Sequence, residues 1–295
     1  TPSLVTLRHI AFPSSGNLPI FVANEKGFFA ARGVADEMET TPSSTYLAKN
    51  LVEGKFDIGS AAVDNVIAYQ EGAGEIEIDR EPDLFVFMGG TQVELSLVVQ
   101  PGIETYQDLK GKSLALDAIA TGFAFVLYRM LDKAGLTPDD YEMVSVGATP
   151  NRLESVRDGS HAGTLLLDPF TAMARAAGFG VLESSLDTFA HYQGQVFTAS
   201  RAWCTEHRDT VVNFISGYLD ALEWVFDPAN EAEAGEILGR NIPAMKPAAI
   251  EPAMKKLLAE RTGLNREARI DMEGLGTVLE LRSQYAPQKK PLTDP

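Results

Sequence analysis

Short hydroxyl and amide side chains gather at three places where a predicted strand leads into a predicted helix. Residues 13–17 (PSSGN) follow a strand at residues 4–12 and precede a helix. Residues 41–45 (TPSST) and 57–65 (DIGSAAVDN) repeat this arrangement. A helix N-terminus leaves free backbone N–H groups, which suit a polar or anionic group of a ligand. Because such loops meet outside the carboxyl ends of strands in an open α/β sheet, we expect the three corners to converge on one crevice.

Arg152 is the only arginine beside a predicted cleft loop. A guanidinium at that place binds a sulfonate, carboxylate or phosphate through two parallel hydrogen bonds. If Arg152 points into the crevice, the sequence favours an anionic ligand. If it lies on a solvated helix face, the serine, threonine and asparagine side chains favour a neutral or heterocyclic ligand. The sequence leaves both possibilities open.

The residue types that metal binding or covalent catalysis requires are scattered along the chain. His9, His161, His191 and His207 share no metal-ligand spacing, and neither HExxH nor CxxC occurs. The single cysteine, Cys204, cannot form an internal disulfide, and its spacing to His207 is a weak basis for a Cys–His nucleophile. GxSxG, P-loop and GxGxxG motifs are also absent, so we expect no metal, no cofactor and no catalytic residues.

Alternating strands and helices must position these side chains. Short apolar runs predict buried strands at residues 4–12, 56–61, 84–88, 95–99, 113–116 and 164–167. Residues 123–134 place apolar side chains on one helical face, and Gly135 follows as a natural left-handed position. Beyond about residue 200, helical spacing continues without strand-like alternation. The sequence therefore predicts an α/β fold with a helical C-terminal third.

The composition indicates a globular protein that does not bind nucleic acid. The 295 residues are too many for one small core and suit two lobes. A net charge of -16 disfavours nucleic acid and anionic membranes, because both attract clustered lysine and arginine. No apolar run reaches the roughly 18 residues of a membrane span. Thr1 opens without a basic and apolar leader, so we expect either a cytosolic chain or one whose signal peptide has been removed.

Four motifs resemble those of one family of transport proteins. They are LPxFVAxEKGFF from Leu18, LxxGxxDIG from Leu51, DLKGK from Asp108, and Asp168 with Pro169. Together they resemble the aliphatic sulfonate, taurine, nitrate and thiamine-pyrimidine (NMT-like) binding proteins, which are substrate-binding proteins of ABC importers. The resemblance runs from about residue 4 to residue 170 and does not specify the ligand.

The resemblance implies a type II periplasmic-binding fold, in which two α/β lobes are joined by two hinge crossovers. Lobe one would combine residues 1–91 and 198–295, and lobe two would comprise residues 92–197. A ligand that touches both lobes would shift the protein toward a closed state. The implied protein is a monomer with its signal peptide removed, either periplasmic or otherwise extracytoplasmic, and either free or anchored to the membrane. It would capture a small sulfonate, carboxylate or heterocycle and deliver it to the membrane subunits of an ABC importer.

The resemblance also implies ligand contacts from both lobes and from the first crossover. These are Ser14, Ser15, Asn17, Ser44, Thr45, Asp64, Asn65, Thr91, Gln92, Thr121, Asn151, Arg152 and Asp168. We expect Asn17 to cap the first helix, and Thr121 and Asn151 to cap two helices of lobe two. Asp168 is shorter than the glutamate expected at its position, and it either contacts the ligand or caps the helix begun by Pro169.

Two other classes of protein remain as alternatives. A cytosolic enzyme of the same two-lobed fold, such as a chorismate dehydratase-like lyase, would use Asp64, Asp117 or Asp168 as its acid or base. A regulatory lobe pair from a transcription factor would need a helix-turn-helix, whereas this chain starts directly with a strand and has no basic helix. The binding protein is therefore the primary prediction, and the enzyme is the alternative.

Overall fold

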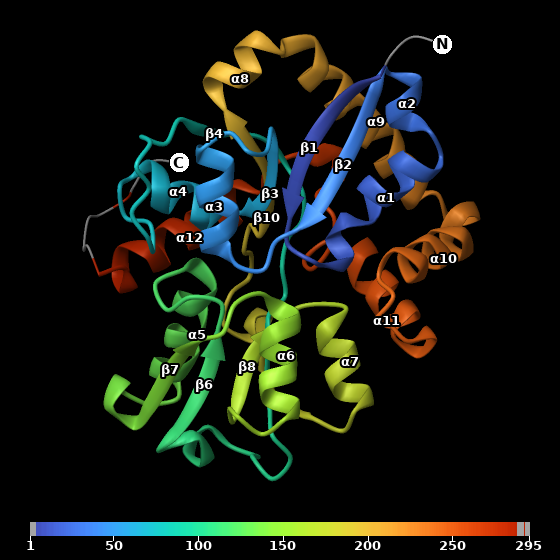
Figure 1. Ribbon diagram of the computed structural model, residues 1–295. Helices are drawn as coiled ribbons and strands as arrows, with labels where there is room; N and C mark the ends of the chain where they lie inside the picture. Colours follow the sequence, from blue (N-terminus) through green and yellow to red (C-terminus); the bar gives the residue numbers. More distant parts are fainter. Residues whose placement is uncertain (1–3, 288–291, 293–295) are drawn as a thin grey trace.

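Two five-stranded sheets form the framework of the protein (Figure 1). The computed structural model describes residues 4–287 and 292. The first sheet has the order β2-β1-β3-β10-β4, and its strands are β1 (Val5–Ala11), β2 (Val34–Thr40), β3 (Ile58–Ala62), β4 (Leu84–Gly89) and β10 (Gln195–Ser200). The second sheet has the order β7-β6-β8-β5-β9, and its strands are β5 (Ser96–Val99), β6 (Lys112–Leu116), β7 (Tyr141–Ser145), β8 (Gly163–Leu166) and β9 (Gly180–Ser184).

Each sheet combines parallel and antiparallel pairing. β1 pairs in parallel with β2 and β3, and β10 runs antiparallel between β3 and β4. β6 pairs in parallel with β7 and β8, and β5 runs antiparallel between β8 and β9. Parallel strands require crossover connections, here helices that cover the sheet faces. The loops that follow β1, β3, β6 and β8 lie at the junction of the two sheets (Figure 1).

Helices fill the connections and make up the last third of the chain. Those before β10 are α1 (Leu18–Glu25), α2 (Phe28–Ala31), α3 (Ser44–Val52), α4 (Val63–Gln70), α5 (Gly122–Lys133), α6 (Thr149–Arg157) and α7 (Phe170–Ala176). Those after it are α8 (Arg201–Glu206), α9 (Arg208–Phe226), α10 (Glu231–Asn241), α11 (Pro247–Leu258) and α12 (Met272–Tyr285). No named strand follows β10 in the described residues, which confirms the predicted helical third. None of the helices within residues 4–287 has the length and apolar content needed to cross a bilayer.

The same helix, glycine and strand unit occurs once beside each sheet. α3 leads through Gly54 into β3, and α6 leads through Gly159 into β8. Both glycines have a φ of 80°, in the left-handed region that side chains with a Cβ rarely adopt. The tight turn at each glycine brings the chain directly back into its sheet, so that the ends of β3 and β8 reach the junction.

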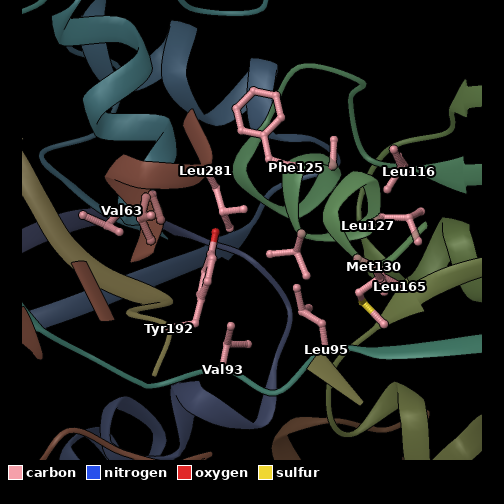
Figure 2. Packing of buried hydrophobic residues seen from close by; sticks show 14 of the residues in the cluster. Val63, Val93, Leu95, Leu116, Phe125, Leu127, Met130, Leu165, Tyr192 and Leu281 are labelled. Carbon is pink, nitrogen blue, oxygen red and sulfur yellow. The ribbon is translucent and has the colours of Figure 1, made fainter. Parts of the chain in front are cut away.

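Two large hydrophobic cores hold the layers together. One packs α1 and α9 against the first sheet. The other is shared by both sheets, because Val63 of α4, Phe125 of α5, Tyr192 of the return crossover and Leu281 of α12 belong to one buried cluster (Figure 2). Burial of an aliphatic or aromatic side chain of this kind contributes about 1.5–3 kcal/mol. α12 packs against both α4 and α5 and thereby connects the two lobes.

The chain passes between the two sheets twice. Residues 90–95 lead from β4 to β5, and residues 185–194 lead from β9 to β10. β10 pairs with β3 from its first residue, since Gln195 lies opposite Ala62, and it pairs with β4 from Val196. All of β10 thus belongs to the first sheet, and the division of the chain into lobes at residues 91/92 and 197/198 stays a prediction. How far the two lobes move as separate bodies stays a prediction.

Candidate ligand-binding site

A cavity of about 60 Å³ lies between the strand ends of the two sheets. This volume is about four times the roughly 15 Å³ that one ordered water requires, so the cavity has room for a small solute. Phe12, Phe123 and Leu167 form an apolar part of its wall. Its polar lining comes from both sheets and from the crossovers and consists of Ser14, Ser60, Asn65, Thr91, Asp117, Thr121, Thr149, Arg152 and Gln195.

The structure brings together some of the expected ligand contacts and separates others. The expected residues that line this cavity are Ser14, Asn65, Thr91, Thr121 and Arg152. An adjoining cavity of about 30 Å³ includes Ser15, Gln92 and Asp168 in its wall. The other expected residues, all within the described part of the chain, line neither cavity: Asn17, Ser44, Thr45, Asp64 and Asn151.

Arg152 points into the cavity and not to solvent. Its side chain is buried. Nη2 donates to Thr149 Oγ1 at 3.0 Å, and Nε and Nη1 donate to the carbonyl oxygens of Leu165 and Gly147, respectively, at 3.3 Å each. These acceptors are neutral, and within the described residues no carboxylate forms an ion pair with this guanidinium. Burial lowers the pKa of Arg152 to about 10, and the charge of Asp117 opposes that shift. The guanidinium is therefore charged at neutral pH and keeps donors for an anion.

Asn17 positions Gln195 and does not cap α1. Its Nδ2 donates to the carbonyl oxygen of Phe12 at 2.8 Å, and its Oδ1 accepts from Gln195 Nε2 at 3.1 Å. The Phe12 carbonyl can only accept, so it fixes the orientation of the Asn17 amide, and Asn17 in turn fixes that of Gln195. Sequence reasoning misses Gln195 because it lies on a strand, where no helix-capping pattern marks it.

The N-termini of α5 and α6 lie at the cavity without the expected side-chain caps. Thr121 occupies the N-cap position of α5, but its hydroxyl donates to the carbonyl oxygen of Ala118 at 3.2 Å. α6 begins at Thr149, so Asn151 lies inside its first turn and not before it. The expectation that Thr121 and Asn151 cap these helices is therefore wrong. Thr121 leaves the first N–H groups of α5 uncapped beside the cavity, where Gly122 also forms part of the wall.

Asp64 forms a buried ion pair and does not face the cavity. Arg282 of α12 donates to its two carboxylate oxygens at 2.6 and 2.7 Å, and the two side chains are 3% and 0% exposed. Arg282 also lies over the ring of Phe125. The expectation of a ligand contact at Asp64 overlooks Arg282, which donates to both carboxylate oxygens and joins α12 to α4.

Asp168 accepts a hydrogen bond from α7, the helix that follows it, and forms an ion pair with Lys256 of lobe one. Its Oδ1 accepts from the backbone of Ala172 at 3.3 Å, and its Oδ2 contacts Lys256 of α11 at 2.9 Å. Lys256 also contacts Glu94 at 2.9 Å. Burial alone would raise the pKa of Glu94, but bonds from Ser184 and Lys256 hold it below its ordinary value. Burial opposes the charged form of Lys256, but the two carboxylates raise its pKa. Lys256 therefore links the lobes.

Other hydrogen bonds join the lobes directly beside the cavity. The backbone N–H of Ala148 donates to the carbonyl oxygen of Pro42 at 2.9 Å. The backbone N–H of Ser44 donates to the Asp117 carboxylate, 3.2 Å from each of its oxygens. Bonds of this length require the two lobes to be in direct contact beside the cavity.

A buried chain of polar side chains holds Ser60 at the cavity. His9 of β1 contacts Asp36 Oδ1 through Nδ1 at 3.0 Å and Ser60 Oγ through Nε2 at 2.7 Å. All three residues are buried. The chain connects β1, β2 and β3 side by side and so fixes the part of the first sheet that ends at the cavity.

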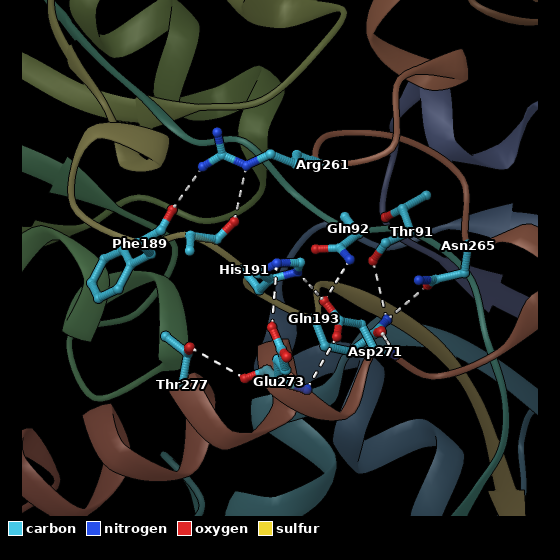
Figure 3. Close-up of polar contacts among 11 residues, drawn as sticks. Thr91, Gln92, Phe189, His191, Gln193, Arg261, Asn265, Asp271, Glu273 and Thr277 are labelled. Carbon is cyan, nitrogen blue, oxygen red and sulfur yellow. Dashed lines mark hydrogen bonds and ion pairs between the residues drawn. The ribbon is translucent and has the colours of Figure 1, made fainter.

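The C-terminal segment braces both crossovers (Figure 3). Gln193 of the return crossover is fully buried, and its amide nitrogen donates to the carbonyl oxygen of Thr91 and to Asn265 Oδ1. Its amide oxygen accepts from the backbone N–H of Asp271, and the Asp271 carboxylate accepts from Gln92. The segment between α11 and α12 therefore connects the two crossovers, about which a hinge motion would occur.

The described residues offer neither a metal cluster nor an activated thiol. Among residues 4–287 and 292, no group of three or more histidine, cysteine, aspartate or glutamate side chains could hold a metal ion. Burial raises the pKa of the Cys204 thiol to about 11, so the thiol is protonated at neutral pH and a poor nucleophile. The ring of His207 packs against Trp203.

Two α/β lobes with a cavity between them have the periplasmic-binding fold. The chain is similar to the periplasmic nitrate-binding protein NrtA from Synechocystis PCC 6803, with a TM-score of 0.77 and 14% identity over 93% of this chain and 75% of that one. It is also similar to the alkanesulfonate-binding protein SsuA from Xanthomonas axonopodis pv. citri, with a TM-score of 0.74 and 17% identity over 99% and 97% of the two chains. These likenesses confirm the predicted fold.

The chain belongs to the NMT1-like family, whose profile matches residues 7–239. A curated relative, the bicarbonate transport ATP-binding protein CmpC from Synechocystis sp. strain PCC 6803, is 23% identical over 235 residues, or 75% of this chain. The chain spans about a third, 35%, of the length of that relative. The resemblance to the NMT-like binding proteins is thus confirmed.

Proposed function

We propose that this protein is an extracytoplasmic solute-binding protein that captures a small organic anion between its lobes and delivers it to an ABC importer. Binding would require no metal and no covalent chemistry, and the protein would act as a monomer. The proposal is supported by family membership and by the fold shared with periplasmic binding proteins for nitrate and alkanesulfonate. The curated relative named for bicarbonate transport supports a solute-transport role as well.

The buried guanidinium of Arg152 is the observation that favours an anionic cargo. A charged group in a protein interior is costly unless an opposite charge and hydrogen bonds compensate it. Three neutral acceptors satisfy part of the Arg152 side chain, and no carboxylate contacts it among the described residues. A sulfonate, carboxylate or comparable oxyanion in the cavity would supply the missing charge. This supports the anionic one of the two possibilities that the sequence leaves open.

Closure around the ligand would provide the affinity. Importers need roughly micromolar capture, which corresponds to about -8 kcal/mol. Hydrogen bonds to a charged group contribute about 1.5–3 kcal/mol each, so a few bonds in a closed cavity reach this range. The cavity offers such groups from both lobes, including Asn65 on α4 and Thr121 at the start of α5.

A pair of matched variants on α6 tests this function. The cargo is first identified by thermal-shift screening against small carboxylates, sulfonates, nitrate, bicarbonate and pyrimidines, and its affinity is then measured by isothermal titration calorimetry. Arg152→Lys keeps the charge but loses the planar fork, so we expect affinity to fall at least tenfold. Arg157→Lys is the control, because Arg157 lies on the same helix and pairs with Glu154 at the surface. Equal affinity in the two variants would contradict an anion site at Arg152.

An enzyme with the same fold would convert the cargo, whereas a binding protein would leave it unchanged. Of the enzyme's three candidate acids, Asp64 is paired with Arg282 and Asp168 with Lys256, so only Asp117 borders the main cavity. The same calorimetry samples, analysed by mass spectrometry after a day of incubation, should contain the cargo unchanged. Turnover of the cargo by the wild-type protein would overturn the binding-protein proposal.

A further inference from the structure

The cavity contains one positive and one negative side chain. Among the described residues that line it, Arg152 is the only cation and Asp117 the only anion. The two groups interact electrostatically, since the Asp117 charge opposes the pKa decrease that burial causes at Arg152. They do not form an ion pair with each other, because Arg152 donates to neutral acceptors and Asp117 accepts from the backbone of Ser44. An occupant of the cavity therefore meets both charges.

Asp117 is held in place by a contact between the two lobes. It follows β6 of the second sheet, and its two oxygens are each 3.2 Å from the backbone nitrogen of Ser44, the first residue of α3, the helix between β2 and β3 of the first sheet. One N–H shared by two oxygens leaves most of the accepting capacity of the carboxylate unused. Asp117 is partly exposed and lines the cavity, so the unused capacity is available to a ligand.

A simple anion fits Arg152 but not Asp117. The acceptor oxygens of acetate or nitrate would lie near the Asp117 carboxylate in a cavity that has room for only a few waters to screen the repulsion. A ligand that also carries an O–H or N–H group satisfies both charges, because it accepts from the guanidinium and donates to the carboxylate. The same arrangement excludes cations without an acceptor, since these would meet Arg152.

We propose that the cargo is a small acid that carries a hydrogen-bond donor next to its anionic group, with Arg152 binding the anion and Asp117 accepting from the donor. Hydroxy acids, amino acids and protonated oxyanions have this chemistry. The inference rests on the proposed function and deepens it, because it adds a requirement to the anionic cargo. Asp117 becomes the residue that determines specificity.

Matched acids that differ by one donor test the proposal. Acetate is compared with glycolate, and propionate with lactate, by calorimetry at neutral pH. A site built to bond a ligand donor discriminates strongly against the analogue that lacks it, so we expect the hydroxy acid of each pair to bind at least tenfold more tightly. In Asp117→Asn, the preference should fall to threefold or less, and acetate and propionate should bind more tightly than to the wild type. Asp139→Asn removes an equal charge from an exposed site and should leave the preference unchanged.

The possible outcomes test the donor requirement at Asp117 separately from the proposed anion site at Arg152. If hydroxy acids and simple acids bind equally to the wild type, the donor requirement is wrong while the anion site stands. If Asp117→Asn weakens all acids by the same factor, Asp117 acts only on lobe closure through Ser44, and the specificity role is overturned. If none of the four acids binds to the wild type and the Arg152→Lys comparison also shows no effect, the proposed anion site itself fails. Melting temperatures within about 3 °C of the wild type show that each variant is folded.

Discussion

Removal of Arg282 should destabilise the protein strongly even though Arg282 lies outside the cavity lining. The perturbation is Arg282→Met, which keeps much of the side-chain volume over Phe125 but removes both hydrogen bonds to Asp64. The Asp64 carboxylate is 0% exposed and lies under α12, so it cannot regain water without movement of that helix. It would be left as an unpaired buried charge.

The magnitude follows from this geometry. Loss of one partner of a buried ion pair costs about 3–5 kcal/mol, because the remaining charge is neither solvated nor compensated. For a protein of this size, that loss lowers Tm by about 8–15 °C. The double variant Asp64→Leu with Arg282→Met removes both charges and should recover most of the stability, since apolar replacement of a buried pair is often close to neutral.

Urea unfolding followed by circular dichroism measures this effect in a double-mutant cycle of the wild type, both single variants and the double variant. We expect each single variant to lose several kcal/mol and the two losses to be far from additive. Two results would refute the reasoning: a loss below about 1 kcal/mol in Arg282→Met, or a double variant as unstable as the sum of the single ones.

Three further predictions concern the lobe contacts and the first sheet. Lys256→Met removes the ion pairs with Glu94 and Asp168, so ligand release in stopped-flow experiments should accelerate about 3- to 10-fold. An unchanged rate would show that these ion pairs do not slow the separation of the lobes. Stability from Glu94, whose pKa is lowered, is present above its ordinary value of 4.5 and lost as pH falls through the lower folded-state pKa. Stability from Lys256, whose pKa is raised, is present below 10.5 and lost as pH rises through its folded-state pKa. The urea midpoint of the wild type should therefore exceed that of Lys256→Met between these limits, and a difference independent of pH would be the contrary result. His9→Ala leaves Asp36 without its buried partner and should lower the free energy of unfolding in urea by about 2–4 kcal/mol. A loss below ~1 kcal/mol would show that the buried polar contacts of His9 do not stabilise the first sheet.

The sequence predicts the strands with mostly apolar runs, among them β4 (LFVFMG) at a sheet edge, and misses β10 and the edge strands β2, β7 and β9. β3 and β8 are flanked by neighbours on both sides and are buried along nearly their whole length. β2, β7 and β9 lie at sheet edges. Their sequences VADEMET, YEMVS and GVLES place acidic residues among apolar ones, because one side of an edge strand faces water, and no apolar run marks them.

Some residues of the candidate site are marked by a local sequence pattern, whereas the surroundings of others depend on partners that are distant in the sequence. Ser14, Thr121 and Arg152 could be predicted because each stands where a strand leads into a helix, and that pattern is local in the sequence. Asp64 satisfies the same pattern, but its partner Arg282 is 218 residues away, so only the folded chain shows that the carboxylate is consumed.

Gln195 presents the opposite case. It stands on a strand and has no local signal, and its place at the cavity results from the bond to Asn17, 178 residues away. Helix capping is likewise predicted too often, because a threonine at an N-cap position can bond backward, as Thr121 does to Ala118.

The central claim is that a small anion is captured between the two lobes at Arg152. A crystal structure of the protein with the cargo found by thermal-shift screening tests it most directly. We expect electron density for the cargo in the cavity, with its anionic oxygens within about 3.2 Å of the Arg152 guanidinium and contacts from both lobes. Density for the cargo at any other place, with the Arg152 side chain still bonded only to Thr149, Leu165 and Gly147, would contradict it.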